Sequence, residues 1–148
     1  MAYAAQVFAQ PLATWERDGL KASLTRAGLP VDDVEQDGPL FWRFERDDVP
    51  VGFAGLEVHG KDALLRSLVT LPPIRLRGVG AAMVAKIETE AIARGATTIY
   101  LLTLDGAAFF AKLGYAACER ARVPALIAAT AEFARLRPDS ATAMTKPI

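Results

Sequence analysis

A basic, glycine-rich segment in the middle of the chain has residue types and spacing suited to binding phosphate. It lies between an apolar segment over 63–71, typical of a strand, and an amphipathic segment that reaches about Arg94. Glycines let the backbone turn tightly and approach a ligand closely. The unpaired N–H groups and the dipole at the start of the following helix attract an anion, and two arginines add full positive charges. We therefore predict that a phosphorylated ligand is bound by Arg75, Leu76, Arg77, Gly78, Val79, Gly80 and Ala81.

Two well-known phosphate motifs do not fit this segment. A Walker loop ends in Lys-Ser/Thr, and no such pair follows the glycines. The dinucleotide fingerprint Gly-x-Gly-x-x-Gly begins at Gly78 and Gly80, but its third position is Met83. The pattern that remains, Arg/Gln-x-x-Gly-x-Gly/Ala from Arg75, resembles the pyrophosphate loop of the GNAT N-acetyltransferase superfamily, which holds acetyl-CoA. The alternative is a glycine-rich turn with surface arginines and no ligand.

A second motif supports this resemblance. Residues 107–115 read Ala-Ala-Phe-Phe-Ala-Lys-Leu-Gly-Tyr and are similar to the superfamily's signature Ala-x-x-Phe-Tyr-x-Lys-Leu-Gly-Phe. The resemblance implies an α/β fold of the GNAT type, with a mixed sheet of six to seven strands flanked by four to five helices. A single domain over residues 1–148 is expected, because a chain of this length holds one core. The implied cosubstrate is acetyl-CoA.

The rest of the chain narrows the resemblance to one bacterial subfamily, the arsenic-resistance N-acetyltransferases. The similar segments are 63–68, the Phe109-Phe110 pair and 123–133. Typical members have two cysteines near the C-terminus, where this chain has Arg137 and Ala143. If those thiols contact trivalent arsenic in the relatives, this chain cannot do the same. The link to arsenic therefore rests on the resemblance alone.

Composition excludes several other classes. The 17 basic and 17 acidic residues cancel, so no overall charge points to nucleic acid or a membrane surface. A single cysteine excludes a disulfide framework. Because the chain also contains only one histidine, a Cys/His metal site is excluded too. No apolar run approaches the roughly 18 residues of a membrane span, and no secretory leader is recognisable. We expect a cytoplasmic protein without metal, nucleic-acid or membrane partners, and a homodimer is left open.

Hydrophobic periodicity and turn residues predict an alternation of strands and helices. The expected helices cover 15–27, 31–36, the segment from the glycine loop to 94, a short stretch from 107, and 124–136. The expected strands cover 4–9, 40–45, 51–58, 63–71, 98–104, a short stretch after 115 to about 121, and 140–146. The strands over 40–45 and 51–58 are expected to form a hairpin.

The resemblance also implies a mechanism, direct attack of an amine on the acetyl thioester. The superfamily stabilises the oxyanion with backbone N–H groups where the strand before the loop splays, here those of Val69 and Thr70. The usual acid, the tyrosine of Phe-Tyr-x-Lys-Leu-Gly, is replaced by Phe110, which donates no proton and is expected to contact the cosubstrate. Because a thiol of pKa ~8.5 is a tolerable leaving group, catalysis without a side-chain acid is favoured. Tyr115 is either a replacement acid or, as is more common, core packing.

The base depends on the acceptor. At pH 7 an α-amino group with a pKa of about 8 costs only about 1.4 kcal/mol to deprotonate, against roughly 4.6 kcal/mol for a lysine. An amino-acid-like acceptor therefore needs little help. The strand-borne candidates are Glu57, which we take as the catalytic residue, His59 and Glu45. His59 precedes Gly60 and fits a turn, and Glu57 fits a solvated strand position equally well.

Arg66 stands alone in an apolar strand, and a buried charge needs a partner. The partner is either a structural carboxylate, such as Glu57 or Glu45, or an anionic group of the substrate, so Arg66 is the candidate substrate-binding residue. The resemblance places one acidic segment over the substrate groove, and its residues are expected to form a solvated face: Asp32, Asp33, Glu35 and Asp37.

These features predict an N-acetyltransferase that moves the acetyl group of acetyl-CoA to the amine of a small molecule, amino-acid-like or containing arsenic or phosphinate. Two other functions stay open. The chain is a non-catalytic acyl-CoA-binding sensor or regulatory module if Phe110 and the lost cysteines mark a loss of catalysis. It is a protein or peptide N-acetyltransferase if its acceptor groove is open.

Overall fold

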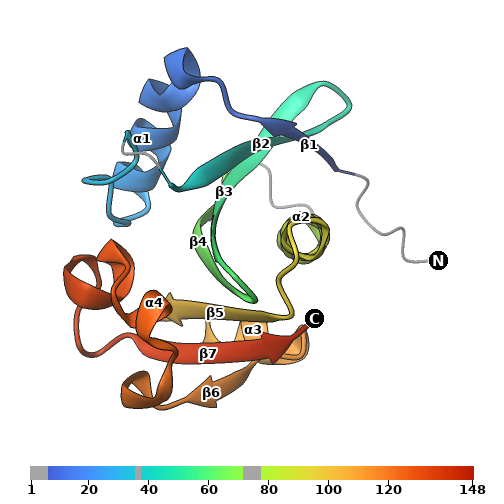
Figure 1. Ribbon diagram of the computed structural model, residues 1–148. Helices are drawn as coiled ribbons and strands as arrows, with labels where there is room; N and C mark the ends of the chain where they lie inside the picture. Colours follow the sequence, from blue (N-terminus) through green and yellow to red (C-terminus); the bar gives the residue numbers. More distant parts are fainter. Residues whose placement is uncertain (1–6, 36–37, 72–77) are drawn as a thin grey trace.

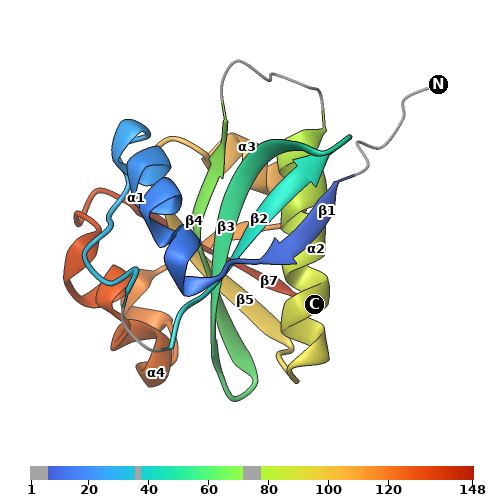
Figure 2. The same cartoon turned by 90° about the horizontal axis from the view of Figure 1, so that it is seen from above.

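The computed structural model describes residues 7–35, 38–71 and 78–148. A seven-stranded mixed sheet runs through them, with the strand order β1-β2-β3-β4-β5-β7-β6 (Figure 1). Helix α1 covers one face of this sheet and α2 covers the other (Figure 2). The expected α/β fold of the GNAT type, with its mixed sheet and flanking helices, is confirmed.

The first four strands pair in antiparallel fashion. They are β1 (Phe8–Pro11), β2 (Leu40–Arg46), β3 (Val49–His59) and β4 (Asp62–Thr70). The turn between β2 and β3 is shorter than expected, because Asp47 and Asp48 adopt φ of 51° and 62°. Positive φ at both central residues is what a two-residue hairpin turn requires. The strand expected over 4–9 is displaced to β1, and residues 1–6 lie outside the described residues.

Helix α1 (Arg17–Arg26) follows a single 3-10 turn over Thr14–Glu16, in place of one continuous helix over 15–27. Its buried residues Leu20 and Leu24 pack with Phe41 and Phe53 of the sheet. The helix expected over 31–36 is wrong, since the described residues 32–35 form a turn closed by the Val34 N–H to the Val31 carbonyl, 3.2 Å.

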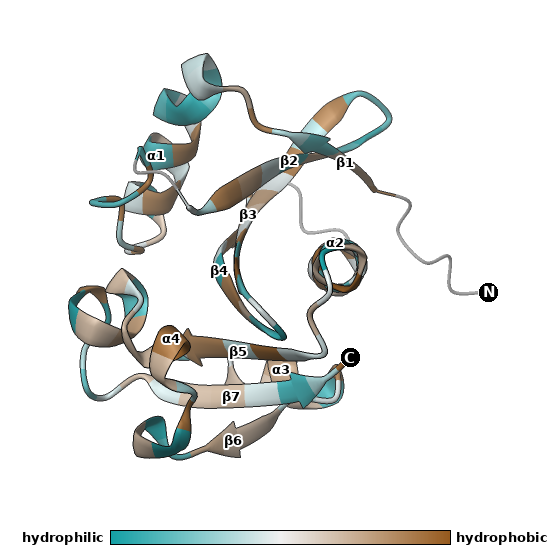
Figure 3. Cartoon of the chain, viewed as in Figure 1, coloured by the Kyte–Doolittle hydropathy of each residue, from teal (hydrophilic) through white to brown (hydrophobic). Residues whose placement is uncertain are grey.

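Helix α2 (Val79–Ala93) lies on the opposite face and confirms its predicted pattern. Val79, Met83, Ile87 and Ala91 recur every four residues and are all buried. This face, together with the strands, forms the largest hydrophobic cluster. Figure 3 shows β5 and parts of β2 and β3 in brown, hydrophobic shades, and the β2–β3 turn and much of α1 in teal.

The C-terminal half contains β5 (Thr98–Thr103), α3 (Ala107–Lys112), β6 (Ala116–Cys118) and β7 (Thr142–Pro147). The single helix expected over 124–136 is two pieces, α4 (Ala125–Ala128) and a π-helical turn over Glu132–Leu136. The break coincides with Thr130, whose hydroxyl donates to the Ile127 carbonyl at 2.7 Å and accepts the Phe133 N–H at 3.4 Å. Such side-chain bonds compete with the helical backbone pattern.

Strands β4 and β5 separate along their length, which opens the sheet at its centre. They run parallel and pair only near their starts, through Asp62–Leu64 on β4. A β-bulge then shifts the β3–β4 register between Phe53 and Gly55, and Ser67 within it has φ of 57°. Because bulges bend and twist a strand, β4 turns away from β5 beyond this point (Figure 1).

Candidate active site

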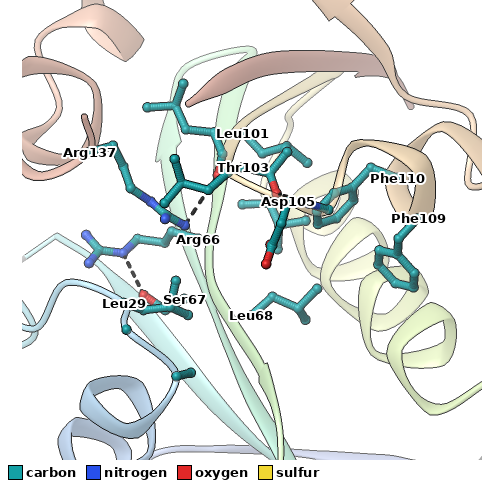
Figure 4. A pocket seen from close by; sticks show the side chains of 16 residues that line it. Leu29, Arg66, Ser67, Leu68, Leu101, Thr103, Asp105, Phe109, Phe110 and Arg137 are labelled. Atoms are coloured by element: carbon teal, nitrogen blue, oxygen red, sulfur yellow. Dashed lines mark hydrogen bonds between the residues drawn. The ribbon is translucent and has the colours of Figure 1, made fainter. Parts of the chain in front are cut away.

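Two adjoining cavities occupy the space between the separated ends of β4 and β5. The inner cavity has a volume of about 270 Å³. It is lined by residues 65–68 of β4, by residues 101–105 at the end of β5 and just beyond it, and by Phe109 and Phe110 of α3 (Figure 4). The outer cavity, of about 470 Å³, is lined by Val69–Leu71 and the end of α1. Both include Leu68 and Asp105 in their walls, so they form one continuous groove, here called the β4–β5 groove.

The start of α2 reaches this groove. A Cβ atom added at Gly80 would lie 3.1 Å from the ring of Phe109, a residue of the inner cavity wall. The two sequence motifs therefore approach each other at Gly80 and Phe109. Gly78, with φ of 85°, precedes the helix, and no side chain of the described residues caps it. The first N–H groups of α2 are therefore available as hydrogen-bond donors to an anion.

The end of β4 presents its backbone alternately to β3 and to the groove. The Leu71 N–H donates to the Val51 carbonyl at 2.9 Å, and Val69 is in register with Phe53. N–H groups of an antiparallel strand alternate between its two sides. The Val69 N–H therefore faces β3, whereas the Thr70 N–H faces the groove. This geometry favours Thr70 as an oxyanion donor and argues against Val69.

Two aromatic rings close the α3 side of the groove. Phe110 is buried and lines the inner cavity, and its ring meets those of Phe109 and Tyr115 edge to face, with centroids 5.0 and 5.6 Å apart. The hydroxyl of Tyr115 donates to Glu88 Oε2 at 2.9 Å. Burial, followed by the adjacent Glu88 carboxylate, raises the pKa of Tyr115 above its usual range.

The guanidinium of Arg66 lies in a buried cluster of three carboxylates. Nη1 is 2.5 Å from Asp33 Oδ2 and 2.9 Å from Glu57 Oε2, and Nη2 is 2.6 Å from Asp33 Oδ1 and 3.5 Å from Glu132 Oε1. Nε donates to Ser67 Oγ at 3.2 Å. Burial alone would lower the pKa of Arg66, but its hydrogen bonds and the charges of Glu132 and Asp33 outweigh burial and raise it. Arg66 is therefore charged and held by the protein itself.

The sequence agrees with a known family over most of its length. Residues 7–115 match the acetyltransferase (GNAT) family. The chain belongs to this family. A comparison with curated protein sequences gave no significant match.

Several solved structures share the fold of this chain. N-acetylglutamate synthase from Neisseria gonorrhoeae, complexed with coenzyme A and N-acetyl-glutamate, aligns with a TM-score of 0.78 and 16% identity, over 99% of this chain and 36% of that chain. This chain thus spans about a third of that synthase. Rv2747 from Mycobacterium tuberculosis, in complex with CoA, aligns with a TM-score of 0.77 and 19% identity over 95% and 99% of the two chains. A putative acyl-CoA N-acyltransferase from Klebsiella pneumoniae aligns at 0.73 and 20% identity, over 97% and 98%.

The predicted cosubstrate-binding residues that the structure describes lie at or beside the β4–β5 groove. Gly78, Val79, Gly80 and Ala81 form the start of α2 beside the groove, and Phe110 lines its inner cavity. The predicted phosphate ligands Arg75, Leu76 and Arg77 lie outside the described residues, so their role stays a prediction.

The structure separates Glu57, the predicted base, from Thr70. Gly52 is the register partner of Thr70, and Glu57 lies five residues further along β3, about 17 Å at the usual rise per residue. Glu57 lines a different cavity, of about 290 Å³, together with Asp33 and His59, whose Nε2 is 3.5 Å from Glu57 Oε1. This distance argues against direct proton transfer from an amine at Thr70 to Glu57.

The contacts of Arg66 favour the structural alternative over substrate binding. All three of its nitrogens face protein oxygens, and its side chain is 0% exposed. The expectation of a solvated acidic face is wrong for Asp33, which is 2% exposed and accepts hydrogen bonds from Arg66 through both carboxylate oxygens. The signal for this burial was present in the sequence, because Val31 and Val34 flank it and a lone buried arginine requires a carboxylate.

Sequence reasoning also missed two charged residues of the groove. Arg137 lines the inner cavity, and Asp105 lines both cavities. Arg137 follows a π-helical turn that hydrophobic periodicity does not predict. Asp105 lies two residues after the end of β5, just beyond the strand expected over 98–104. Over 7–35, 38–71 and 78–148, no group of three or more His, Cys, Asp or Glu side chains is arranged so that it could hold a metal ion. In the same ranges no helix is both long and apolar enough to span a membrane.

We expect Phe110→Tyr to keep or raise turnover, because the added hydroxyl would lie in the wall of the inner cavity, where a proton donor assists thiolate departure. General-acid catalysis contributes about 10²-fold or more, so even partial alignment is measurable as kcat. Tyr115→Phe serves as the matched control and should leave kcat unchanged, since its hydroxyl bonds Glu88. A hundredfold loss in Tyr115→Phe with intact acetyl-CoA affinity would identify Tyr115 as the acid.

Proposed function

We propose that this chain is an acetyl-CoA-dependent N-acetyltransferase that acts on a small-molecule amine. The observation that carries the proposal is the β4–β5 groove, which brings together the start of α2, the Thr70 N–H and the inner cavity. The helix start suits the pyrophosphate of CoA. The groove along β4 suits its extended pantetheine arm, and the inner cavity suits the acceptor.

Within this arrangement the residues divide the chemistry. The acceptor nitrogen attacks the thioester carbonyl carbon, a C–N bond forms, and the carbonyl oxygen gains the negative charge. The Thr70 N–H, aimed into the groove, stabilises that charge in the transition state. The C–S bond then breaks, the amine's proton passes to solvent and CoA leaves as thiolate. Phe110 excludes water from one wall and supplies no proton.

The acceptor we propose is small, because the inner cavity has a volume of only about 270 Å³. Amino-acid-like compounds, including phosphinic and arsenic-containing ones, are the class implied by the resemblance to arsenic-resistance N-acetyltransferases. N-acetylglutamate synthase, with its bound N-acetyl-glutamate, is a neighbour whose product is of this class. Arg137 and the buried Ala143 replace the two cysteines of that subfamily, so any arsenic would be bound without those thiols. A cytoplasmic location and a homodimer stay predictions.

A second function, non-catalytic acyl-CoA binding, is favoured by one observation: Phe110 occupies the position of the usual acid. A sensor or regulatory module would bind acetyl-CoA in the same groove but acetylate nothing. Protein or peptide acetylation is less favoured, because the inner cavity has a volume of only about 270 Å³.

Acetyl-CoA should raise the melting temperature of the protein. A ligand that binds only the folded state stabilises it by about 2.7 kcal/mol at a hundredfold excess over Kd. Differential scanning fluorimetry with acetyl-CoA, NAD and ATP at equal concentrations measures this shift. NAD or ATP producing a larger shift than acetyl-CoA would overturn the proposed ligand. Free-thiol release with a panel of small amines then distinguishes the transferase from the binding module.

A further inference from the structure

The inner cavity carries opposite charges at two places in its wall. Three of its lining residues are charged: Arg66, Arg137 and Asp105. The guanidinium of Arg66 is already paired with three carboxylates, so Arg137 and Asp105 are the charged residues that could bind a ligand. The remaining walls are mostly apolar side chains and backbone from β4, β5 and α3 (Figure 4).

Arg137 has donors to spare. Its Nε is 3.2 Å from Glu132 Oε2, and its Nη2 donates to the Leu102 carbonyl over a long 3.4 Å. No acceptor among the described residues bonds Nη1, and Nη1 is not sealed from solvent. The side chain as a whole is only 10% exposed, and Arg137 is one of the residues that line the inner cavity.

Glu132 fixes the direction of Arg137. Its carboxylate bridges the two arginines, with Oε1 facing Arg66 and Oε2 facing Arg137. Burial raises the pKa of Glu132 above its usual value. The positive charges of Arg66 and Arg137 oppose this rise but do not cancel it. A side chain held through Nε by a buried carboxylate presents its outer edge with little loss of rotamer entropy on binding. Figure 4 shows this guanidinium beside Arg66 and Thr103, at the wall of the cavity.

Asp105 lies where the inner and outer cavities meet. It follows β5, lines both cavities and is exposed, and the outer cavity also contains Thr70. Figure 4 shows its carboxylate directed toward Leu68, across the groove from the Phe110 side. An ammonium group attracted to Asp105 is therefore near the place of acetyl transfer, whereas an anion attracted to Arg137 is deeper in the cavity.

We propose that the acceptor is a zwitterion whose anionic group, a carboxylate or an oxyanion of similar geometry, binds Arg137 while its ammonium group meets Asp105. This inference rests on the proposed acetyltransferase function and names its substrate class. The planar fork of a guanidinium pairs with two oxygens of such an anion at once. Neutral amines leave Arg137 without an anion, and polyamines place a second positive charge against it, so both are disfavoured.

The first test compares matched acceptors on the wild-type protein. Each of a set of small α-amino acids is assayed against its own carboxamide by thiol release, under saturating acetyl-CoA. We expect the carboxylate member to have the larger kcat/KM, by about 10- to 100-fold, which is the usual strength of a hydrogen-bonded charged contact. Equal kcat/KM for the two members of each pair overturns the proposal.

The second test uses Arg137→Gln and Arg137→Lys. In Arg137→Gln the preference for the carboxylate should collapse, mainly through KM for the acid and with little change for the carboxamide. Arg137→Lys should recover part of it, because the charge returns without the bidentate fork. Acetyl-CoA affinity, measured separately, should be unchanged in both. An Arg137→Gln protein that folds and keeps the preference contradicts the assignment.

A binding measurement separates this inference from the proposed function. With CoA bound, the protein is titrated calorimetrically with N-acetyl amino acids and with their carboxamides. If no amine is acetylated but the acids bind more tightly in an Arg137-dependent manner, the transferase function fails and the anion site stands. If acids and carboxamides bind equally, or neither binds, the anion site is overturned whatever the catalytic result.

Discussion

Replacing Gly80 by aspartate abolishes acetyl-CoA binding in this account, while the chain still folds. The new carboxylate would stand in the first turn of α2, where the N–H groups that attract the pyrophosphate begin. It would oppose the negative charge of the ligand and, with its Cβ 3.1 Å from the Phe109 ring, displace a wall of the inner cavity. We expect no acetyl-CoA-dependent rise in melting temperature and no detectable heat of binding by calorimetry.

Two variants control for this change. Gly80→Ala adds the Cβ without the charge, so it should weaken binding through Phe109 alone and retain measurable affinity. Gly19→Asp makes the same substitution in α1, where nothing lies within 4 Å of the added Cβ, and should leave the affinity unchanged. Unaltered acetyl-CoA affinity in Gly80→Asp would mean that the ligand binds elsewhere.

The largest loss of stability is expected from Arg66→Met. The substitution removes the cation that contacts Asp33, Glu57 and Glu132, and it leaves those carboxylates facing one another in a buried cluster. Breaking a buried ion pair in this way typically costs about 3–5 kcal/mol. Chemical denaturation should show this loss in the free energy of unfolding.

The loss should depend on pH in one direction. Burial already raises the pKa of Glu132 above its unfolded value of 4.5, and removing Arg66 takes away the largest opposing effect. A carboxyl whose folded pKa exceeds its unfolded pKa contributes stability below the unfolded value and loses it as the pH rises through the folded value. The difference in melting temperature between wild type and Arg66→Met should therefore be larger at pH 8 than at pH 5.

Arg122→Met is the matched control, because Arg122 pairs with Glu119 at 3.2 Å but is 81% exposed. Exposed pairs contribute little, so its stability should stay close to wild type at both pH values. Should Arg66→Met keep its stability and show only a raised KM for the acceptor, the structural role is refuted and the substrate-binding prediction for Arg66 revived.

The elements that the sequence predicted well are those with a strong local signal. The four-residue recurrence from Val79 to Ala91 defined α2, and the apolar run over 63–71 defined β4. The two motifs around the glycine loop and Phe110 led to the family and to the groove. Such signals depend on neighbours in the chain and need no knowledge of distant contacts.

The predictions that failed depend on contacts between distant segments. Asp33 looks like one member of an acidic surface run, yet Arg66, 33 residues away, holds it in the interior. The helix over 124–136 breaks at Thr130 because a side-chain hydroxyl replaces backbone bonds. Whether Val69 or Thr70 faces the groove depends on the β3–β4 register and its bulge, which periodicity does not specify.

The central claim is that this groove transfers an acetyl group from acetyl-CoA to a small amine. The most direct test incubates the protein with acetyl-CoA carrying a ¹³C-labelled acetyl group and a panel of amino acids, and follows thiol release and labelled amide by mass spectrometry. We expect one labelled amide for each CoA thiol released, and neither product with Gly80→Asp. Tight binding of acetyl-CoA with no amide from any acceptor, or thiol release without amide, would contradict it.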